Sequence, residues 1–231
     1  MFTWHENDNA AAAAQSLADA VAAALQSTLD EKGRAVLAVS GGRSPIAFFE
    51  ALSHKDLAWS NVGITLVDER IVPTVHPDSN TALVREYLLK NKASAARWIP
   101  MVEDGKPENR LPPQEVVDFA LQHYRQPDVL VLGMGGDGHT ASLFPQAPQL
   151  EAGIDLENDV TLLHTTPVTA PYERVSMTLG AILKTPHIFL AIQGADKKAV
   201  FERAAAAPTT EFPISLILNQ NGANCHVYYA K

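Results

Sequence analysis

The run VLVLGMGGDGHTASLF, residues 129–144, concentrates residue types that can do chemistry. Its glycines Gly133, Gly135 and Gly138 follow an apolar stretch with the G-x-G-x-x-G spacing of a dinucleotide-binding turn. Asp137 lies inside that turn, where its charge would repel a pyrophosphate. The next strand-like run, which ends LLHTT, lacks the terminal acid that contacts a ribose in such sites. A dinucleotide site is therefore the weaker interpretation.

The stronger interpretation treats Asp137 and His139 as a catalytic pair, two residues apart. A neutral imidazole can accept a proton near pH 7, and an adjacent carboxylate fixes which ring nitrogen carries the proton. The letters HTASLF predict a short helix, whose N-terminal potential would keep His139 neutral. Asp137 could instead bind the substrate directly. The structural alternative is a glycine turn in which His139 merely caps the helix.

A second glycine turn, SGGRSP at residues 40–45, connects an apolar run to a helix-like one. Ser40 and the two glycines after it predict backbone N–H groups that bind phosphate or carboxylate, aided by the helix start. We expect Ser44 to cap that helix, with Pro45 at its first position. The stretch lacks the motif of a nucleotide-triphosphate loop. An ordinary tight turn is the alternative.

A third polar stretch, VDERIVPTVHPDSN, begins where a β-branched run ends. Arg70 offers a planar fork for a phosphate or carboxylate. The alternative is a surface ion pair of Arg70 with Asp68 or Glu69. His76 and Ser79 are weaker candidates, since Ser79 equally suits the cap of the next helix.

Further basic residues occur in the C-terminal half of the chain. Arg174 lies in ERVSMTL, and Lys197 and Lys198 lie in QGADKKA, after another strand-like run. Either lysine could close a phosphate pocket with its point charge. The alternative is that both lysines are solvated at a helix start.

The elements that must position these residues alternate between strand and helix. Apolar or β-branched runs predict strands over residues 35–42, 62–69, 128–135, 160–166 and 187–194, with further apolar runs at 214–219 and 225–230. Helical patterns cover residues 9–32, 44–53, 79–91, 113–124, 174–185 and 196–207. This alternation predicts one α/β domain over residues 1–231, with a mostly parallel sheet covered by helices on both faces.

Composition narrows the classes of function. The formal net charge of −8 argues against nucleic acid and anionic membranes as partners. The single Cys225 excludes an internal disulfide framework, and no apolar run approaches the length of a membrane span. The first ten residues lack the pattern of a signal peptide. We therefore expect a cytoplasmic protein.

Together, the stretches LAVSGGRSP, VDERIVPTVHPDSN, LGMGGDGHTASLFP, RVSMTL and GADKKA resemble the glucosamine-6-phosphate isomerase/6-phosphogluconolactonase superfamily, in its lactonase branch. The resemblance spans nearly the whole chain. It implies a doubly wound, Rossmann-like, three-layer α/β fold. It also implies hydrolysis of 6-phospho-D-glucono-1,5-lactone to 6-phospho-D-gluconate, in the oxidative branch of the pentose phosphate pathway. No metal and no organic cofactor are implied, and the expected partner is a small phosphosugar lactone acted on by a monomer or small homo-oligomer.

Carried onto matching positions, the resemblance implies that His139 is the general base for attack of water on the lactone carbonyl. Asp137 would orient His139 or the sugar. The residues implied to bind the substrate are Ser40, Gly41, Gly42, Arg70, Arg174 and Lys198. Which basic residue meets the phosphate and which the carbonyl oxygen stays open, as does the choice between Lys197 and Lys198.

Two other functions compete with the lactonase interpretation. The deaminase branch of the superfamily carries a catalytic glutamate five residues after the histidine, where this chain has Phe144. Phenylalanine cannot titrate, which disfavours deamination with isomerisation. A non-catalytic sugar-phosphate sensor would keep the anion-binding turn and Arg70, but it would not need both Asp137 and His139.

Overall fold

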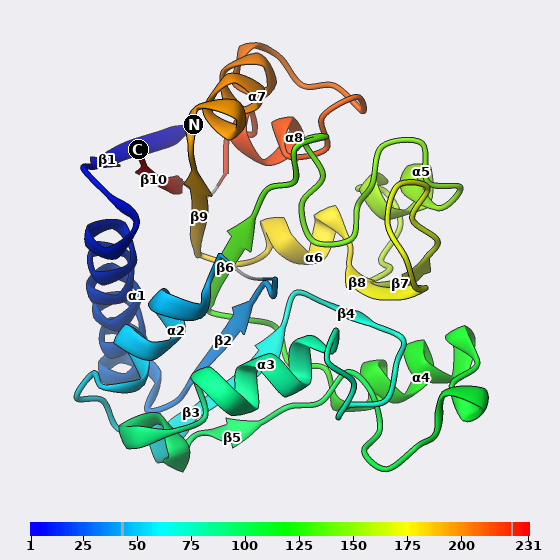
Figure 1. The fold of residues 1–231 in the computed structure, drawn as a ribbon, viewed down its shortest axis with the longest axis horizontal. Coiled ribbons are helices and arrows are strands. Elements are labelled where there is room, and N and C mark those ends of the chain that lie inside the picture. The colour runs from blue at the N-terminus through cyan, green and yellow to red at the C-terminus, as the bar shows by residue number, and fades with distance from the viewer. Residues whose placement is uncertain (43, 223) are drawn as a thin grey trace.

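The computed structural model describes residues 1–42, 44–222 and 224–231. Its main sheet has seven strands, all paired in parallel, in the order β1-β10-β9-β6-β2-β3-β5 (Figure 1). Their bounds are Phe2–Asn7 (β1), Ala35–Val39 (β2), Val62–Leu66 (β3), Arg97–Trp98 (β5), Val129–Gly133 (β6), His187–Gln193 (β9) and Cys225–Ala230 (β10). The predicted mostly parallel sheet is confirmed.

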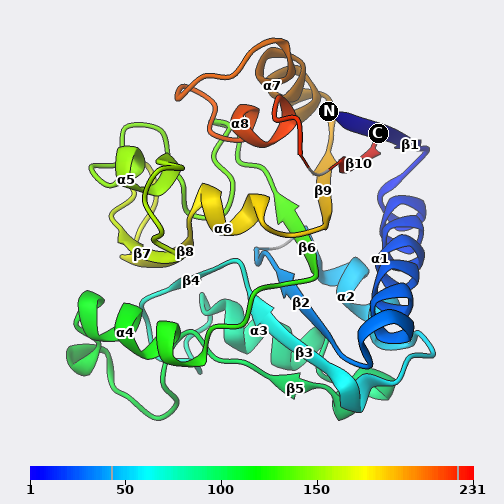
Figure 2. The same cartoon turned by 180° about the vertical axis from the view of Figure 1, so that it is seen from behind.

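Helices cover both faces of this sheet, as predicted. Those described are α1 (Ala10–Lys32), α2 (Ile46–Ser53), α3 (Asn80–Tyr87), α4 (Pro113–His123), α5 (Leu150–Ile154), α6 (Leu179–Leu183), α7 (Ala195–Ala206) and α8 (Ser215–Leu218). In Figure 1, α1, α2 and α3 lie on the nearer face, whereas Figure 2, from behind, has α4 and α6 nearer the viewer. Short 3₁₀ turns cover Trp59–Asn61, Asn91–Ala95 and Glu108–Arg110.

Local sequence explains the first helix. The Asn9 side chain accepts a hydrogen bond from the Ala12 backbone N–H at 2.9 Å and so caps the N-terminus of α1. Gly33 ends the helix with a left-handed φ of 70°, which a residue with a side chain rarely adopts. The helix buries an apolar stripe of leucine and valine spaced four residues apart, in the hydrophobic core: Leu17, Val21, Leu25 and Leu29.

The strand order creates a switch point between β2 and β6. From β2 the chain proceeds to β3 and β5 on one side, whereas β6, β9 and β10 follow on the other. In such sheets, ligands bind at the carboxyl ends of the strands that flank the switch point. The two glycine turns of the sequence follow β2 and β6, so both lie at this position.

A second, three-stranded antiparallel sheet departs from the sequence prediction. Its strands are β7 (Leu162–Thr165), β8 (Arg174–Met177) and β4 (Asp68–Arg70), in the order β4-β8-β7. The expected single strand over residues 62–69 is therefore divided at Val67: its N–H still bonds to Val39 of the main sheet, but its carbonyl already accepts from Met177. Likewise, the expected helix over residues 174–185 begins as a strand and becomes helical only at Leu179.

Two local predictions are wrong. Ser44 does not cap α2, which begins after Pro45 without a side-chain cap. HTASLF forms no helix, because Ala141 has a positive φ of 50° and the Leu143 N–H closes a tight turn onto the Thr140 carbonyl at 3.0 Å. Within the described ranges, no helix is both long and apolar enough to cross a membrane.

Candidate active site

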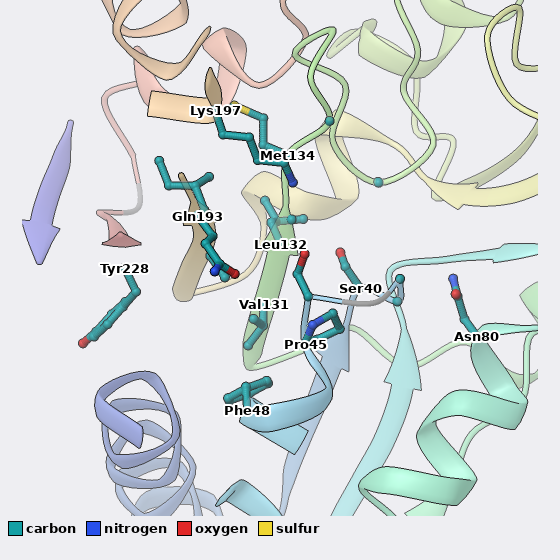
Figure 3. A pocket seen from close by; sticks show the side chains of 18 of the residues that line it. Ser40, Pro45, Phe48, Asn80, Val131, Leu132, Met134, Gln193, Lys197 and Tyr228 are labelled. Carbon is teal, nitrogen blue, oxygen red and sulfur yellow. The ribbon is translucent and has the colours of Figure 1, made fainter. Parts of the chain in front are cut away.

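A cavity of about 420 Å³ opens at the switch point. Its lining comes from the ends of β2, β6 and β9, from β4 and β8, and from α1, α2 and β10. Figure 3 shows Ser40, Asn80, Gln193, Lys197 and Tyr228 around this space. The side formed by α1 and α2 is largely apolar, whereas β4 and β8 contribute charged side chains and the loop after β6 contributes His139.

The loop after β6 brings Asp137 and His139 into direct contact. The Asp137 Oδ1 lies 2.5 Å from the His139 Nδ1 and also accepts the His139 backbone N–H at 3.2 Å. Gly135 makes room for this pair, because a Cβ there would lie 2.2 Å from two ring atoms of His139. Gly138 turns the chain with a φ of 77°. The glycines therefore shape the loop around the pair.

Electrostatics keep the Asp137 carboxyl ionised. Burial favours its neutral form, but the hydrogen bond and the charge of His139 outweigh burial and lower the pKa of Asp137 to about 2. The carboxylate accepts the Nδ1–H of His139, which leaves Nε2 with the ring's free lone pair. Nε2 has no hydrogen-bond partner among the described residues, and His139 lines the cavity. The geometry suits a general base.

Phe144 stacks on the His139 ring, with ring centroids 4.1 Å apart and planes at 29°. This is the position at which the deaminase branch would carry its glutamate. Here it supports the imidazole face without any titratable group. HTASLF is not helical, so the expected potential of a helix N-terminus is absent from the described loop. Instead, the Phe144 ring and the Asp137 carboxylate position His139.

The glycine turn after β2 forms another part of the wall. A Cβ on Gly41 would lie 1.9 Å from the Asn80 side-chain oxygen, so only glycine allows this close approach. Gly42 has a φ of 93°. The Ser40 Oγ is buried and has no partner among the described residues, although Ser40 lines the cavity. Arg43, within the same motif, lies outside the described residues.

Arg70 and Arg174 lie opposite each other in the antiparallel pairing of β4 and β8. Both line the cavity, and both Nε groups are buried without a partner in the described structure. The Arg174 Nη2 donates to the Pro171 carbonyl at 2.9 Å, and the Arg70 Nη1 donates to the Asp78 carbonyl. Burial, above all, lowers the pKa of the Arg174 guanidinium, against the opposing effect of Asp68.

The expected alternative of an ion pair between Arg70 and its neighbours is wrong. Glu69 is fully buried, and its carboxylate accepts the backbone N–H groups of Asn80 and Thr81 at 2.7 Å. The Asp68 Oδ2 accepts the Ser142 hydroxyl at 2.6 Å. Among the described residues, neither arginine has a carboxylate oxygen within the 4.0 Å of an ion pair. Two cationic groups therefore line the cavity without forming an ion pair with a described residue.

The structure places Lys197, rather than the expected Lys198, in the cavity (Figure 3). Lys198 Nζ lies over the rings of Tyr229 and Trp4, at 5.2 and 5.7 Å from their centroids. Successive residues at a helix start point in different directions, so the motif alone could not choose between the lysines. Burial lowers the pKa of Lys197.

Sequence reasoning named Asp68 only as an ion-pair partner, and it did not single out three other polar residues of the wall: Asn80, Gln193 and Tyr228. Asp68 lines the cavity, and Asn80 donates its side-chain N–H to the Asp68 carbonyl at 2.9 Å. Asn80 follows Ser79 in the motif VDERIVPTVHPDSN. The signal that could have predicted its position is the glycine at residue 41, which leaves room for a neighbouring side chain close to the backbone. Ser79 does cap α3, accepting from the Ala82 N–H at 3.2 Å. In the described part of the chain, no three metal-ligating side chains gather.

The arrangement can transfer a proton next to a site that suits an anion. Comparisons with known proteins identify the family of this chain. The model of "Glucosamine-6-phosphate isomerases/6-phosphogluconolactonase" matches residues 8–226. The 6-phosphogluconolactonase of Neisseria meningitidis serogroup A is 73% identical over 231 residues, which cover 100% of both chains. The chain belongs to the glucosamine-6-phosphate isomerase/6-phosphogluconolactonase family.

Solved structures agree with this assignment. A crystal structure from Neisseria gonorrhoeae FA 1090 has a TM-score of 0.99 and 72% sequence identity, covering 100% of both chains. A 6-phosphogluconolactonase from Shewanella baltica OS155 has a TM-score of 0.92 at 34% identity, over 100% of this chain and 98% of that one. The predicted doubly wound α/β fold is confirmed.

Proposed function

We propose that this protein hydrolyses 6-phospho-D-glucono-1,5-lactone to 6-phospho-D-gluconate, in the oxidative branch of the pentose phosphate pathway. The observation that carries the proposal is one cavity lined both by His139, which Asp137 holds, and by two arginines that form no ion pair with a described residue. Full-length relatives that bear the name 6-phosphogluconolactonase support it.

In the proposed reaction, the His139 Nε2 takes a proton from water as the water oxygen attacks the lactone carbonyl carbon. The tetrahedral intermediate then collapses, and the bond from that carbon to the ring oxygen breaks. His139 returns the proton to the ring oxygen, which becomes a hydroxyl group. Asp137 stays ionised and holds the imidazole in the tautomer that this cycle needs.

Binding energy comes from the basic and polar wall. We propose that the phosphate and the carbonyl oxygen of the substrate are held by Ser40, Gly41, Gly42, Arg70, Arg174 and Lys197. Lys197 replaces Lys198 here because only Lys197 lines the cavity. Holding the phosphate at a distance from the reacting carbon orients the lactone without a covalent nucleophile. A cytoplasmic location stays a prediction, based on the single Cys225.

The competing functions fit the site less well. Phe144 gives the imidazole a stacked ring where a deaminase needs a carboxylate. A sensor would have no use for an ionised aspartate that orients a histidine lone pair toward the cavity. Both observations favour lactone hydrolysis.

The test is a coupled assay on freshly prepared 6-phosphogluconolactone, in which a dehydrogenase reports the 6-phosphogluconate formed. The wild-type protein should exceed the spontaneous rate, and His139→Ala should lower kcat by about 10²–10⁴-fold. His164→Ala is the matched control, because His164 also pairs with a carboxylate, that of Glu173, but does not line the cavity. A wild-type rate equal to the spontaneous background would exclude the lactonase.

A further inference from the structure

Two loops meet at the arginine end of the cavity. One follows β4 and carries His76 and Asp78, and the other precedes β8 and carries Tyr172. The Tyr172 hydroxyl donates to the Asp78 Oδ2 at 2.9 Å, and the rings of His76 and Tyr172 make an edge contact with centroids 5.6 Å apart. The backbone carbonyl of the same Asp78 accepts from the Arg70 Nη1.

This arrangement leaves a carboxylate beside an arginine with which it does not pair. Charge-assisted pairs between a guanidinium and a carboxylate are among the strongest hydrogen bonds in proteins. The hydrogen bond from Arg70 goes to the Asp78 carbonyl, whereas the half-exposed Asp78 carboxylate accepts from Tyr172. The His76 Nδ1 lies 4.0 Å from the Asp78 Oδ2 and accepts the Asp78 backbone N–H at 3.1 Å.

The backbone of the second loop is also unusual at this point. Tyr172 has a φ of 69°, a left-handed conformation that is costly for a residue with a bulky side chain. The preceding carbonyl, that of Pro171, accepts from the Arg174 Nη2 at 2.9 Å. One strained turn thus orients Arg174 through a carbonyl and holds Asp78 through a hydroxyl. Strain of this kind concentrates where a precise position has a function.

We propose that Tyr172 is a positioning residue that holds the Asp78 carboxylate away from Arg70, so that the Arg70 guanidinium stays open to the anionic oxygens of the substrate. The inference rests on the proposed function for the identity of that substrate. Tyr172 acts through Asp78, which in its absence would rotate and compete with the substrate for Arg70. Arg70 lines the cavity, so its guanidinium is the group kept open to the substrate.

Three variants test this role. Tyr172→Phe should raise KM for the lactone about fivefold and leave kcat unchanged. A change of this size is the loss of affinity expected when a half-exposed ion pair competes with the substrate. Adding Asp78→Asn to Tyr172→Phe should restore the wild-type KM, because an amide does not neutralise Arg70. Tyr124→Phe is the control, since it also deletes a tyrosine hydroxyl bond, to Gln126 at 2.9 Å, but lies outside the cavity lining.

Binding of 6-phosphogluconate, measured by calorimetry, should follow the same pattern without any turnover. An unchanged KM and affinity in Tyr172→Phe would overturn the inference, as would a loss that Asp78→Asn fails to rescue, because a merely structural role predicts no rescue. A wild-type protein without lactonase activity contradicts the proposed function instead. In that case, calorimetry with 6-phosphogluconate and with inorganic phosphate still decides the role of Tyr172.

Discussion

The two carboxylate oxygens of Asp137 have different surroundings, and this difference matters for His139. Oδ1 accepts from the imidazole and the backbone N–H of His139, whereas Oδ2 accepts, among the described residues, a long hydrogen bond from the Thr169 hydroxyl at 3.3 Å. Most of what holds the carboxylate ionised is therefore its histidine partner. His139 keeps Asp137 ionised, and the Asp137 carboxylate in turn fixes the tautomer of His139.

Asp137→Asn tests this coupling in activity. An amide oxygen can still accept from Nδ1, but the neutral group no longer stabilises an imidazolium, and an amide rotated by 180° would donate to Nδ1 and place the proton on Nε2. We expect kcat to fall by about 10²-fold or more with a smaller change in KM. Steady-state kinetics measure the separate effects on kcat and KM. Asp159→Asn, on an exposed loop, is the control. A variant with the wild-type kcat would contradict the role of Asp137.

The same substitution has an effect on acid stability. The pKa of Asp137 is about 2 in the folded protein, below its ordinary value of 3.8. Its ionised form therefore stabilises the fold above about pH 4, and this contribution is lost as the pH falls toward 2. Urea unfolding of the wild type and Asp137→Asn should differ at pH 6 and converge near pH 2.

At the scale of elements, the loop after β6 needs a glycine at some positions and tolerates a side chain at others. Gly135→Ala should displace the imidazole, because the added Cβ would lie 2.2 Å from His139 ring atoms, and kcat should fall at least about tenfold. Gly136→Ala is a matched control one residue away, since its Cβ would meet no atom within 4 Å and its φ is not positive. Kinetics of both variants, with circular dichroism to verify folding, provide the measurement. Equal losses in the two would mean that general loop flexibility, and not the position of His139, matters.

Elements also show what sequence patterns could predict. Hydrophobic period predicted α1 and the buried parallel strands, because these signals are local, such as the continuous apolar run at residues 129–133. The division at Val67 was not predictable in this way. Leu66 and Val67 look alike in sequence. Only the tertiary partners of Val67, Val39 for its N–H and Met177 for its carbonyl, show that the chain passes from one sheet to the other at this residue.

For the site, glycine spacing and residue type predicted the Asp137–His139 contact and the two glycine turns. Three features were beyond such reasoning. The positive φ of Ala141 ends the expected helix, the direction of each side chain separates Lys197 from Lys198, and Tyr172 has its partner far away in the sequence. Each depends on packing between distant segments, which no short window of sequence contains.

At the scale of the whole molecule, the cavity collects side chains from both halves of the main sheet. A ligand bound there contacts β2 and β4 as well as β6 and β9, so it should oppose global unfolding. At a concentration of 100 times Kd, 6-phosphogluconate should add about 2.7 kcal/mol to the free energy of unfolding. For a chain of this size, that corresponds to a rise in Tm of roughly 5–10 °C.

Thermal unfolding with and without ligand measures the shift. Gluconate without phosphate is the control, and it should give a much smaller rise because it lacks the anion that the basic wall binds. An equal shift with gluconate would show that the phosphate contributes nothing to affinity. His139→Ala, which keeps the basic wall, should retain most of the shift.

The pairing of β1 with β10 has a consequence for biosynthesis. β1 is an edge strand whose neighbour in the sheet is β10, with Phe2 opposite Cys225 and Asn7 opposite Ala230. On the ribosome, β1 must therefore wait on the order of ten seconds or more before its neighbour is translated. Because Tyr228 and Ala230 also line the cavity, we expect the nascent chain to acquire its ligand site only when this strand docks.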